Sequence, residues 1–148
     1  LAATHVDDPA RKSPIVDLTI EGTPRNLHPI ARDDVYRIAG EALRNAFRHA
    51  SAHRVEVHLR YDDEQLQVRI RDDGNGIDAA VLDEQPSGHF GLPGMRERAE
   101  LIGGRLEVWS ERGVGTEVDL RIPAGTAYAM PRERGRSRFF GARTGTNV

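Results

Sequence analysis

The sequence predicts an α+β domain, built as a two-layer α/β sandwich in which helices cover one face of a mixed, mostly antiparallel sheet. Three observations support this prediction. Three segments alternate apolar and polar residues with the period of a strand, and one segment repeats apolar residues at helical spacing. The segments follow one another as strand, helix, hairpin, glycine-rich loop, helix and hairpin, an order that fits one sheet with helices on one face.

A strand and a long helix are expected to open the domain. Residues 15–21 alternate in the manner of a strand, and residues 22–32 are expected to form a loop. Asp33 and Asp34 place acidic side chains where the dipole of a starting helix favours them. Apolar residues then recur at helical spacing over residues 35–50, which predicts an amphipathic helix.

Two hairpins and a second helix complete the predicted sheet and its cover. The strands at residues 55–61 and 66–71 have one apolar and one polar face, and a turn of three acidic residues joins them. After a polar stretch, residues 95–102 are expected to form the second helix, which two glycines end. The second hairpin has its strands at residues 105–110 and 116–122.

The composition indicates one globular domain with a short extension at each end. Of the 148 residues, 38% are hydrophobic and 30% charged; there is no cysteine and no apolar run long enough to cross a membrane. We place the folded domain at residues 15–124, after a linker remnant at residues 1–14 and before a flexible basic tail at residues 125–148. Residues 131–148 contain five arginines and one glutamate, a net charge of +4, and since the chain has a formal charge of −2 the rest carries −6. An acidic body argues against nucleic-acid binding, because affinity for DNA or RNA rests on cationic contacts to phosphates.

Polar residues line one side of the predicted first helix. Glu41, Asn45 and His49 are spaced by four residues beside the apolar face, and Arg48 adjoins His49. An asparagine placed there can offer its carbonyl oxygen to Mg²⁺, which prefers oxygen ligands, and Arg48 and His49 can donate to phosphate oxygens. The alternative is that these residues are only the solvated side of an amphipathic helix.

A glycine-rich turn directly follows the strand at residues 66–71. Gly74 and Gly76 would let the backbone approach a ligand closely. The Asp72 carboxylate, at the end of the strand, can accept a hydrogen bond from an exocyclic amine such as that of adenine. The alternative is an ordinary turn, since Asp, Asn and Gly are common turn residues.

A second glycine-rich stretch leads into the second helix. Gly88, Gly91 and Gly94 lie before and at the helix start, where backbone N–H groups and the helix dipole suit the phosphates of a nucleotide. This is not the Walker pattern, because no Lys-Ser/Thr pair follows the glycines. A third glycine cluster, at residues 113–116, also fits an ordinary hairpin turn.

Taken in order, these motifs resemble the nucleotide-binding boxes of the ATPase superfamily shared by gyrase, the heat-shock chaperone, histidine kinases and MutL. The boxes are Glu41-x-x-x-Asn45-x-x-Arg48-His49, Asp72-x-Gly74-x-Gly76, Gly88-x-x-Gly91-Leu92-x-Gly94-Met95 and Gly113-x-Gly115-Thr116. The stretch GLPGMRERAELIGG at residues 91–104 is particularly similar to sensor histidine kinases that work with NarL/LuxR-type response regulators. The resemblance covers residues 16–123 and implies the Bergerat-type ATP-binding fold.

The resemblance implies a role for each matching residue. Asp72 would hold the adenine amino group, while Asn45 would ligate Mg²⁺ with Glu41 beside it as a second catalytic residue. The rest of the implied nucleotide site comprises Arg48 and His49 at the phosphates, Gly74, Gly76 and Ile77 around the adenine, Gly88, Gly91, Leu92, Gly94 and Met95 at the lid and helix start, and Thr116 at the far side. Residues 78–94 would form a short lid, in which Pro93 departs from a family pattern that commonly has a basic residue there.

The resemblance further implies the catalytic domain of a bacterial sensor histidine kinase. Such a domain binds ATP and Mg²⁺ and donates the γ-phosphate to a histidine on a separate dimerisation domain, for relay to a response regulator, here of the NarL/LuxR type. No segment resembles the phosphoacceptor helix, so the chain is expected to be a fragment that cannot autophosphorylate. We expect this fragment to be a monomer and the parent kinase to be a homodimer. The domain would lie in the cytoplasm, and the membrane anchoring of the parent is left open.

Two alternatives share part of this pattern. A serine kinase of the anti-sigma-factor type carries the same boxes but acts on an anti-anti-sigma factor and binds a sigma factor. A nucleotide-binding module without catalysis would have a degenerate site, and the intact Asn45, Asp72 and glycines argue against that.

Overall fold

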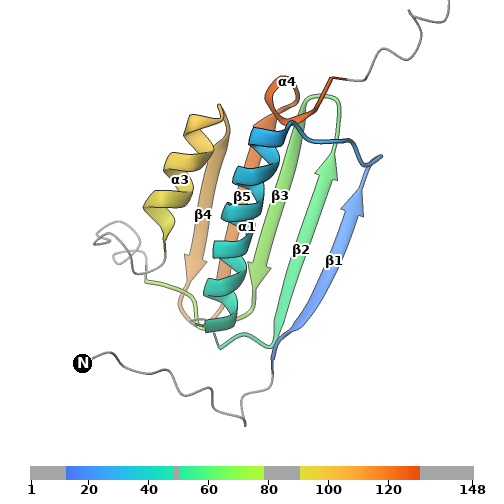
Figure 1. Cartoon of the computed structure of the whole chain (residues 1–148). Helices are drawn as coiled ribbons and strands as arrows, with labels where there is room; N and C mark the ends of the chain where they lie inside the picture. Colours follow the sequence, from blue (N-terminus) through green and yellow to red (C-terminus); the bar gives the residue numbers. More distant parts are fainter. Residues whose placement is uncertain (1–12, 49–50, 79–90, 131–148) are drawn as a thin grey trace, which may run out of the picture.

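A five-stranded sheet and two helices on one of its faces form the body of the domain (Figure 1). The computed structural model describes residues 13–48, 51–78 and 91–130. The strand order is β1-β2-β3-β5-β4. The elements are β1 (Ile15–Glu21), α1 (Pro29–Arg48), β2 (Arg54–Tyr61), β3 (Gln65–Asp72), α3 (Leu92–Leu101), β4 (Arg105–Glu111), β5 (Gly115–Pro123) and α4 (Ala124–Ala127).

The sheet is mixed at a single pairing. β1 runs parallel to β2, whereas β2, β3, β5 and β4 pair antiparallel with their neighbours. Both α1 and α3 lie on the same face of the sheet (Figure 1). The predicted fold class, with helices on one face of a mixed, mostly antiparallel sheet, is confirmed.

The hydrophobic core lies between the sheet and these two helices. Alternate residues of β3 and β5 point into it, as the period of two in their sequences predicts. The principal core residues are Ile38, Ala42 and Ala46 of α1, Leu66, Val68 and Ile70 of β3, Met95 and Ala99 of α3, and Val118, Leu120 and Ile122 of β5. None of the helices in the described part of the chain is long and apolar enough to cross a membrane.

The first helix begins earlier than predicted. Its first residue is Pro29 rather than Asp33, so the predicted loop is shorter than residues 22–32. The His28 carbonyl oxygen accepts the N–H of Arg32 at 2.9 Å, and His28 Nδ1 accepts the N–H of Ile30 at 3.3 Å. Pro29 fits the first helical position because its missing N–H would have had no partner there. The prediction was wrong because His28 is not one of the residues by which helix starts are usually recognised.

The second helix also begins earlier than predicted, at Leu92 instead of residue 95. Gly91 precedes it in the left-handed region, with φ of 67°, and its carbonyl oxygen accepts the Met95 N–H at 3.0 Å. The prediction treated Pro93 as part of the loop. Proline is tolerated in the first turn of a helix, where no intrahelical partner awaits its N–H.

The folded chain continues past residue 124, where the tail was predicted to begin. Residues 124–127 form α4, and Ala127 and Tyr128 are buried in the core. The Tyr128 hydroxyl donates to the carbonyl oxygens of Asp62 at 3.0 Å and Gln65 at 2.8 Å. This segment therefore seals the end of the β2–β3 hairpin, and residues 125–128 belong to the domain. Residues 131–148 lie outside the described residues.

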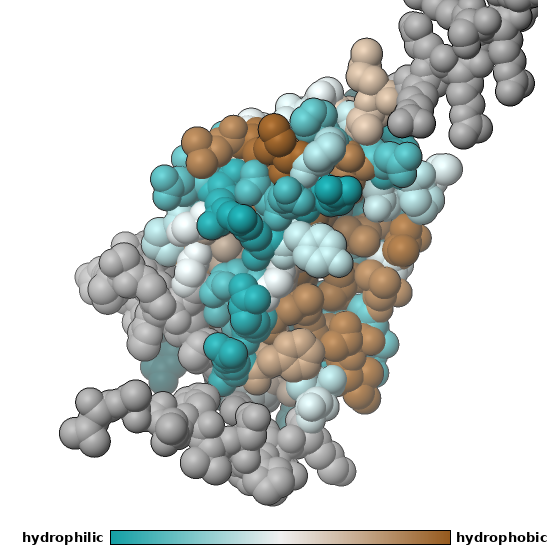
Figure 2. Space-filling model, viewed as in Figure 1, coloured by the Kyte–Doolittle hydropathy of each residue, from teal (hydrophilic) through white to brown (hydrophobic). Residues whose placement is uncertain are grey.

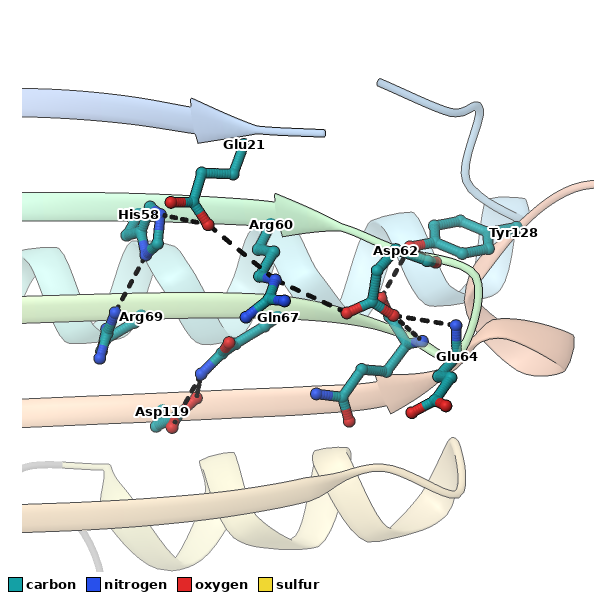
Figure 3. A network of polar contacts seen from close by, with 10 residues as sticks. Glu21, His58, Arg60, Asp62, Glu64, Gln67, Arg69, Asp119 and Tyr128 are labelled. Atoms are coloured by element: carbon teal, nitrogen blue, oxygen red, sulfur yellow. Dashed lines mark hydrogen bonds and ion pairs between the residues drawn. The ribbon is translucent and has the colours of Figure 1, made fainter. Parts of the chain in front are cut away.

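The other face of the sheet is polar (Figure 3). Gln67 Nε2 donates to both carboxylate oxygens of the buried Asp119, at 3.0 and 3.1 Å. Arg69 lies 3.0 Å from His58 Nδ1, and His58 Nε2 lies 3.4 Å from Glu21. Cross-strand pairs of this kind link the four neighbouring strands β1, β2, β3 and β5 on this side of the sheet.

Candidate nucleotide site

The described residues of the predicted site meet at one end of the molecule. β3, β4 and α1 end there, and β5 and α3 begin there (Figure 1). Motifs as far apart in the sequence as Glu41 and Thr116 are therefore brought to one end of the sheet, beneath the C-terminal end of α1.

Asp72 is the last residue of β3 and is 7% exposed. Its Oδ1 accepts the Gly74 N–H at 2.9 Å. Burial raises the pKa of the Asp72 carboxyl, and the backbone N–H groups of Gly74 and Thr116 oppose that effect. None of the ion pairs within residues 13–48, 51–78 and 91–130 involves Asp72. A buried carboxylate with no cation beside it is suited to a neutral donor such as an amino group.

The segment after Asp72 is fastened to the β4–β5 hairpin. Gly76 has a φ of +71°, and a Cβ there would stand 2.0 Å from the Glu111 carbonyl oxygen. The Ile77 N–H donates to Ser110 Oγ at 2.6 Å, and this oxygen lies 2.7 Å from Thr116 Oγ1. Gly76, Ile77 and Thr116 are therefore brought together, as the resemblance implies.

The polar flank of α1 faces the start of α3. A Cβ on Gly91 would stand 2.9 Å from Glu41 Oε1, so glycine allows the two helices to approach closely at this point. Asn45 lies on the same flank one turn later and is half-buried. Arg48 is exposed at the C-terminal end of α1. The stripe that was predicted along α1 therefore borders the same end of the sheet as Asp72.

The residues at the start of α3 divide into core and surface. The side chains of Leu92 and Met95 are buried in the hydrophobic core, so only their backbone is available to a ligand. Gly94 is exposed, and a Cβ there would meet no described atom within 4 Å. Packing among the described residues thus gives no reason for glycine at this position. His49 and Gly88, with the predicted lid residues 79–90, lie outside the described residues.

The structure adds two residues that sequence reasoning missed. Arg44 donates to Glu41 Oε2 at 2.6 Å and forms an ion pair with it, so Glu41 is held by Arg44 on one side and Gly91 on the other. Their spacing of three residues was a usable signal. Ser110 joins the turn residue Ile77 to Thr116, and it stands opposite Thr116 in the β4–β5 register. In the sequence, only the length of the turn between β4 and β5 could have indicated that Ser110 and Thr116 pair.

The polar groups fit a nucleotide better than a bare metal. Within the described part of the chain, no three His, Cys, Asp or Glu side chains gather in a way that could hold a metal ion. Mg²⁺ takes few protein ligands when phosphate oxygens and water supply the others. A single oxygen donor such as Asn45 on α1 is thus compatible with Mg²⁺ that arrives bound to a nucleotide, and the buried Asp72 carboxylate could accept a hydrogen bond from its base.

Comparison with known proteins supports this interpretation. Residues 30–126 match the family model described as histidine kinase-, DNA gyrase B- and HSP90-like ATPase. The sensor histidine kinase LiaS of Bacillus subtilis is 33% identical over 132 residues, which cover 89% of this chain and 34% of LiaS. The signal transduction histidine-protein kinase/phosphatase DegS of the same organism is 30% identical over 103 residues, 70% of this chain and 27% of DegS.

A solved structure agrees with these relatives. The histidine kinase domain of the blue-light activated histidine kinase EL346 from Erythrobacter litoralis aligns with a TM-score of 0.59 and 28% identity, over 74% of this chain and 55% of that one. The chain thus spans about a third or less of the two Bacillus relatives and about half of the solved domain. It is a histidine kinase-type ATPase domain, and it belongs to the family of histidine kinase-, DNA gyrase B- and HSP90-like ATPases.

Proposed function

We propose that this domain binds Mg–ATP at the end of the sheet formed by Asp72, Gly74, Gly76, Ile77 and Thr116, and donates the γ-phosphate to a histidine on a separate domain. The observation that carries the proposal is the buried carboxylate of Asp72, which has no ion-pair partner among the described residues and lies at the same end of the sheet as the polar flank of α1. A carboxylate in that setting distinguishes an amino group, which donates a hydrogen bond, from a carbonyl group, which cannot.

The other residues would act on the phosphate end of the nucleotide. Asn45 would contribute an oxygen to the metal ion, and Mg²⁺, when bound, neutralises phosphate charge and orients the phosphoryl group. Arg48 and His49 would donate to phosphate oxygens, and the backbone N–H groups at the start of α3 would add the positive end of a helix dipole. Glu41, held by Arg44, would orient water or a metal-bound group beside Asn45. Phosphoryl transfer depends mainly on such positioning and charge neutralisation, and these are the contributions that the named residues would make.

The partners are those that the resemblance to sensor histidine kinases implies. The acceptor histidine would come from the dimerisation helices of the parent kinase, and a response regulator, of the NarL/LuxR type, would receive the phosphoryl group afterwards. Alone, the domain is expected to bind ATP without labelling itself.

Phosphoryl transfer between separate chains tests this proposal. The domain is incubated with Mg²⁺ and γ-labelled ATP, alone and with the dimerisation helices of the parent kinase added as a second chain. We expect label only on the helices, in an acid-labile and base-stable phosphohistidine. Acid-stable label on serine would instead indicate the anti-sigma type of kinase. If ATP binds but no label is transferred, the domain is a binding module and the proposed catalysis is wrong.

A further inference from the structure

Part of the helix-bearing face of the sheet, over β1 and the adjoining side of β2, has no described helix over it. α1 contacts β3 and α3 contacts β4, whereas β1 and β2 extend beyond α1 (Figure 1). The parallel register sets Val16, Leu18 and Ile20 beside core-facing residues of β2, so these three side chains point to the same side as the core. They are nevertheless 46%, 60% and 51% exposed.

These side chains belong to a continuous apolar surface. Figure 2 shows an apolar patch over β1 and β2 beside α1. We call it the β1–α1 surface and define it by Val16, Leu18 and Ile20 of β1 with the half-buried Val57 and Leu59 of β2. Two strands at their usual spacing of about 5 Å form a strip about 10 Å wide, which is roughly the diameter of one helix.

A second stripe of α1 forms the wall of this surface. Its members are spaced by four residues and lie on the flank of the helix away from Glu41 and Asn45. They are Val35, Ala39, Leu43 and Phe47, of which Phe47 is 40% exposed. The surface is therefore separate from the candidate nucleotide site, with α1 between them. A contiguous exposed apolar area of this kind is typical of a surface against which another segment or protein packs.

The chain itself leaves the domain beside this surface. His28 and Ala127 share a backbone hydrogen bond of 2.8 Å, and Ala129 and Asn26 share one of 2.9 Å. Residues 127–129 thus run antiparallel to residues 26–28. The direction of this ladder carries the chain at Met130 back toward the C-terminal end of β1.

Residues 131–148 contain aromatic side chains that suit the apolar β1–α1 surface. Phe139 and Phe140 are the only aromatic residues in residues 131–148. Phe139 is the ninth residue after Met130, a reach of about 30 Å when extended, and β1 with seven residues is about 23 Å long. The extended reach from Met130 to the two rings thus exceeds the length of β1, so the rings can lie over this surface.

The charges are complementary as well. Five arginines follow Met130, and the chain leaves beside the β2–β3 turn, where Asp62, Asp63 and Glu64 are consecutive. Within the described residues only Arg25 and Arg60 form ion pairs with this turn, and both distances are 3.7 Å. Attraction between the basic segment and the acidic turn would hold the segment near the sheet, although salt would screen it.

We propose that residues 131–148 fold back over the β1–α1 surface of their own chain, with Phe139 and Phe140 packed between α1 and β1. The segment takes the place that a third helix would occupy on the sheet. It leaves the nucleotide end of the domain open, because α1 separates the two regions.

A spin label tests this proposal directly, because the chain has no cysteine of its own. Gly141→Cys in the full chain carries a nitroxide next to Phe140, and methyl NMR then reports which side chains it broadens. We expect strong broadening at Leu18, Val57 and Leu59 and little at Leu101, which is exposed on α3 away from the surface. Leu18→Ser should reduce the selective broadening, whereas the matched control Leu101→Ser should not. Both leucines are exposed, so neither change threatens the fold.

Two results would overturn the proposal. The first is broadening that is equal at both sets of methyl groups, or that survives Phe139→Ser combined with Phe140→Ser. The second is broadening found only on unlabelled chains mixed with labelled ones, which would show that a second copy covers the surface.

Discussion

Asp72 and Asp73 are adjacent, yet the fold gives their carboxyl groups opposite environments. Burial raises the pKa of Asp72, whereas hydrogen bonds from the backbone N–H groups of Arg54 and His53, at 2.9 and 2.8 Å, lower the pKa of Asp73. Where folding raises the pKa of an acid, the native state loses stability as the pH rises through the folded-state pKa. Where folding lowers the pKa, the acid stabilises the native state above its unfolded-state pKa, and this stability is lost as the pH falls through the folded-state pKa.

We therefore predict opposite effects of two matched substitutions on the ligand-free protein. At neutral pH, Asp72→Asn should raise the midpoint of thermal unfolding, because it removes a buried charge. Asp73→Asn should lower the midpoint, because it removes a charge that accepts two N–H groups. Both differences from the wild type should shrink as the pH is brought below the ordinary range of aspartate. Unfolding followed by circular dichroism from pH 3 to 7 checks this, and a lower midpoint for Asp72→Asn at pH 7 would contradict it.

The glycines of the β4–β5 turn offer a second test at the scale of single residues. Gly113 and Gly115 both have positive φ, of 80° and 142°, but a Cβ on Gly113 would meet no described atom within 4 Å, whereas one on Gly115 would stand 1.9 Å from the Asp72 carbonyl oxygen. We expect Gly113→Ala to cost about 1 kcal/mol for its backbone conformation alone. Gly115→Ala should cost more, about 2–3 kcal/mol, because the strands must also move apart. Equal losses in urea unfolding would show that this contact is not tight.

At the scale of elements, α4 and Tyr128 show what the sequence pattern could not reveal. A four-residue helix has too few residues for periodicity, and basic residues soon follow it, so the region resembles a tail. Its place is set by contacts far along the chain, from the Tyr128 hydroxyl to the carbonyl oxygens of Asp62 and Gln65. Long elements with clear periodicity, such as the strands of both hairpins, were predicted well because their local pattern and their packing agree.

Tyr128→Phe measures the contribution of this element. The ring remains packed beside Tyr61, but two partly buried carbonyl oxygens lose their donor. We expect a loss of about 1–2 kcal/mol in the free energy of unfolding. Tyr36→Phe is the matched control, since Tyr36 is 79% exposed and should change stability by less than about 0.5 kcal/mol. Indistinguishable variants in urea titrations would mean that α4 does not fasten the hairpin.

At the scale of the whole molecule, the order of the motifs predicted more than any one of them. Each glycine cluster alone also fits an ordinary turn, but a single sheet edge brings Asp72, Gly76 and Thr116 together and sets the polar flank of α1 beside them. The sequence could not reveal the bond from Ile77 to Ser110, because it depends on how the turn after β3 packs against the β4–β5 hairpin. The uncovered strip over β1 and β2 likewise emerges only from the assembled sheet.

The most direct test of the central claim is calorimetric titration with a nonhydrolysable ATP analogue, with and without Mg²⁺, on the wild type, Asp72→Asn and Asp73→Asn. We predict that the wild type and Asp73→Asn bind alike in Mg²⁺, because the Asp73 carboxylate accepts the backbone N–H groups of His53 and Arg54 at the start of β2. Asp72→Asn should bind about 10- to 100-fold more weakly, as expected for loss of a hydrogen bond to a charged acceptor. A folded wild type that does not bind, or an Asp72→Asn variant that binds like the wild type, would contradict the assignment of Asp72 as the residue that holds adenine.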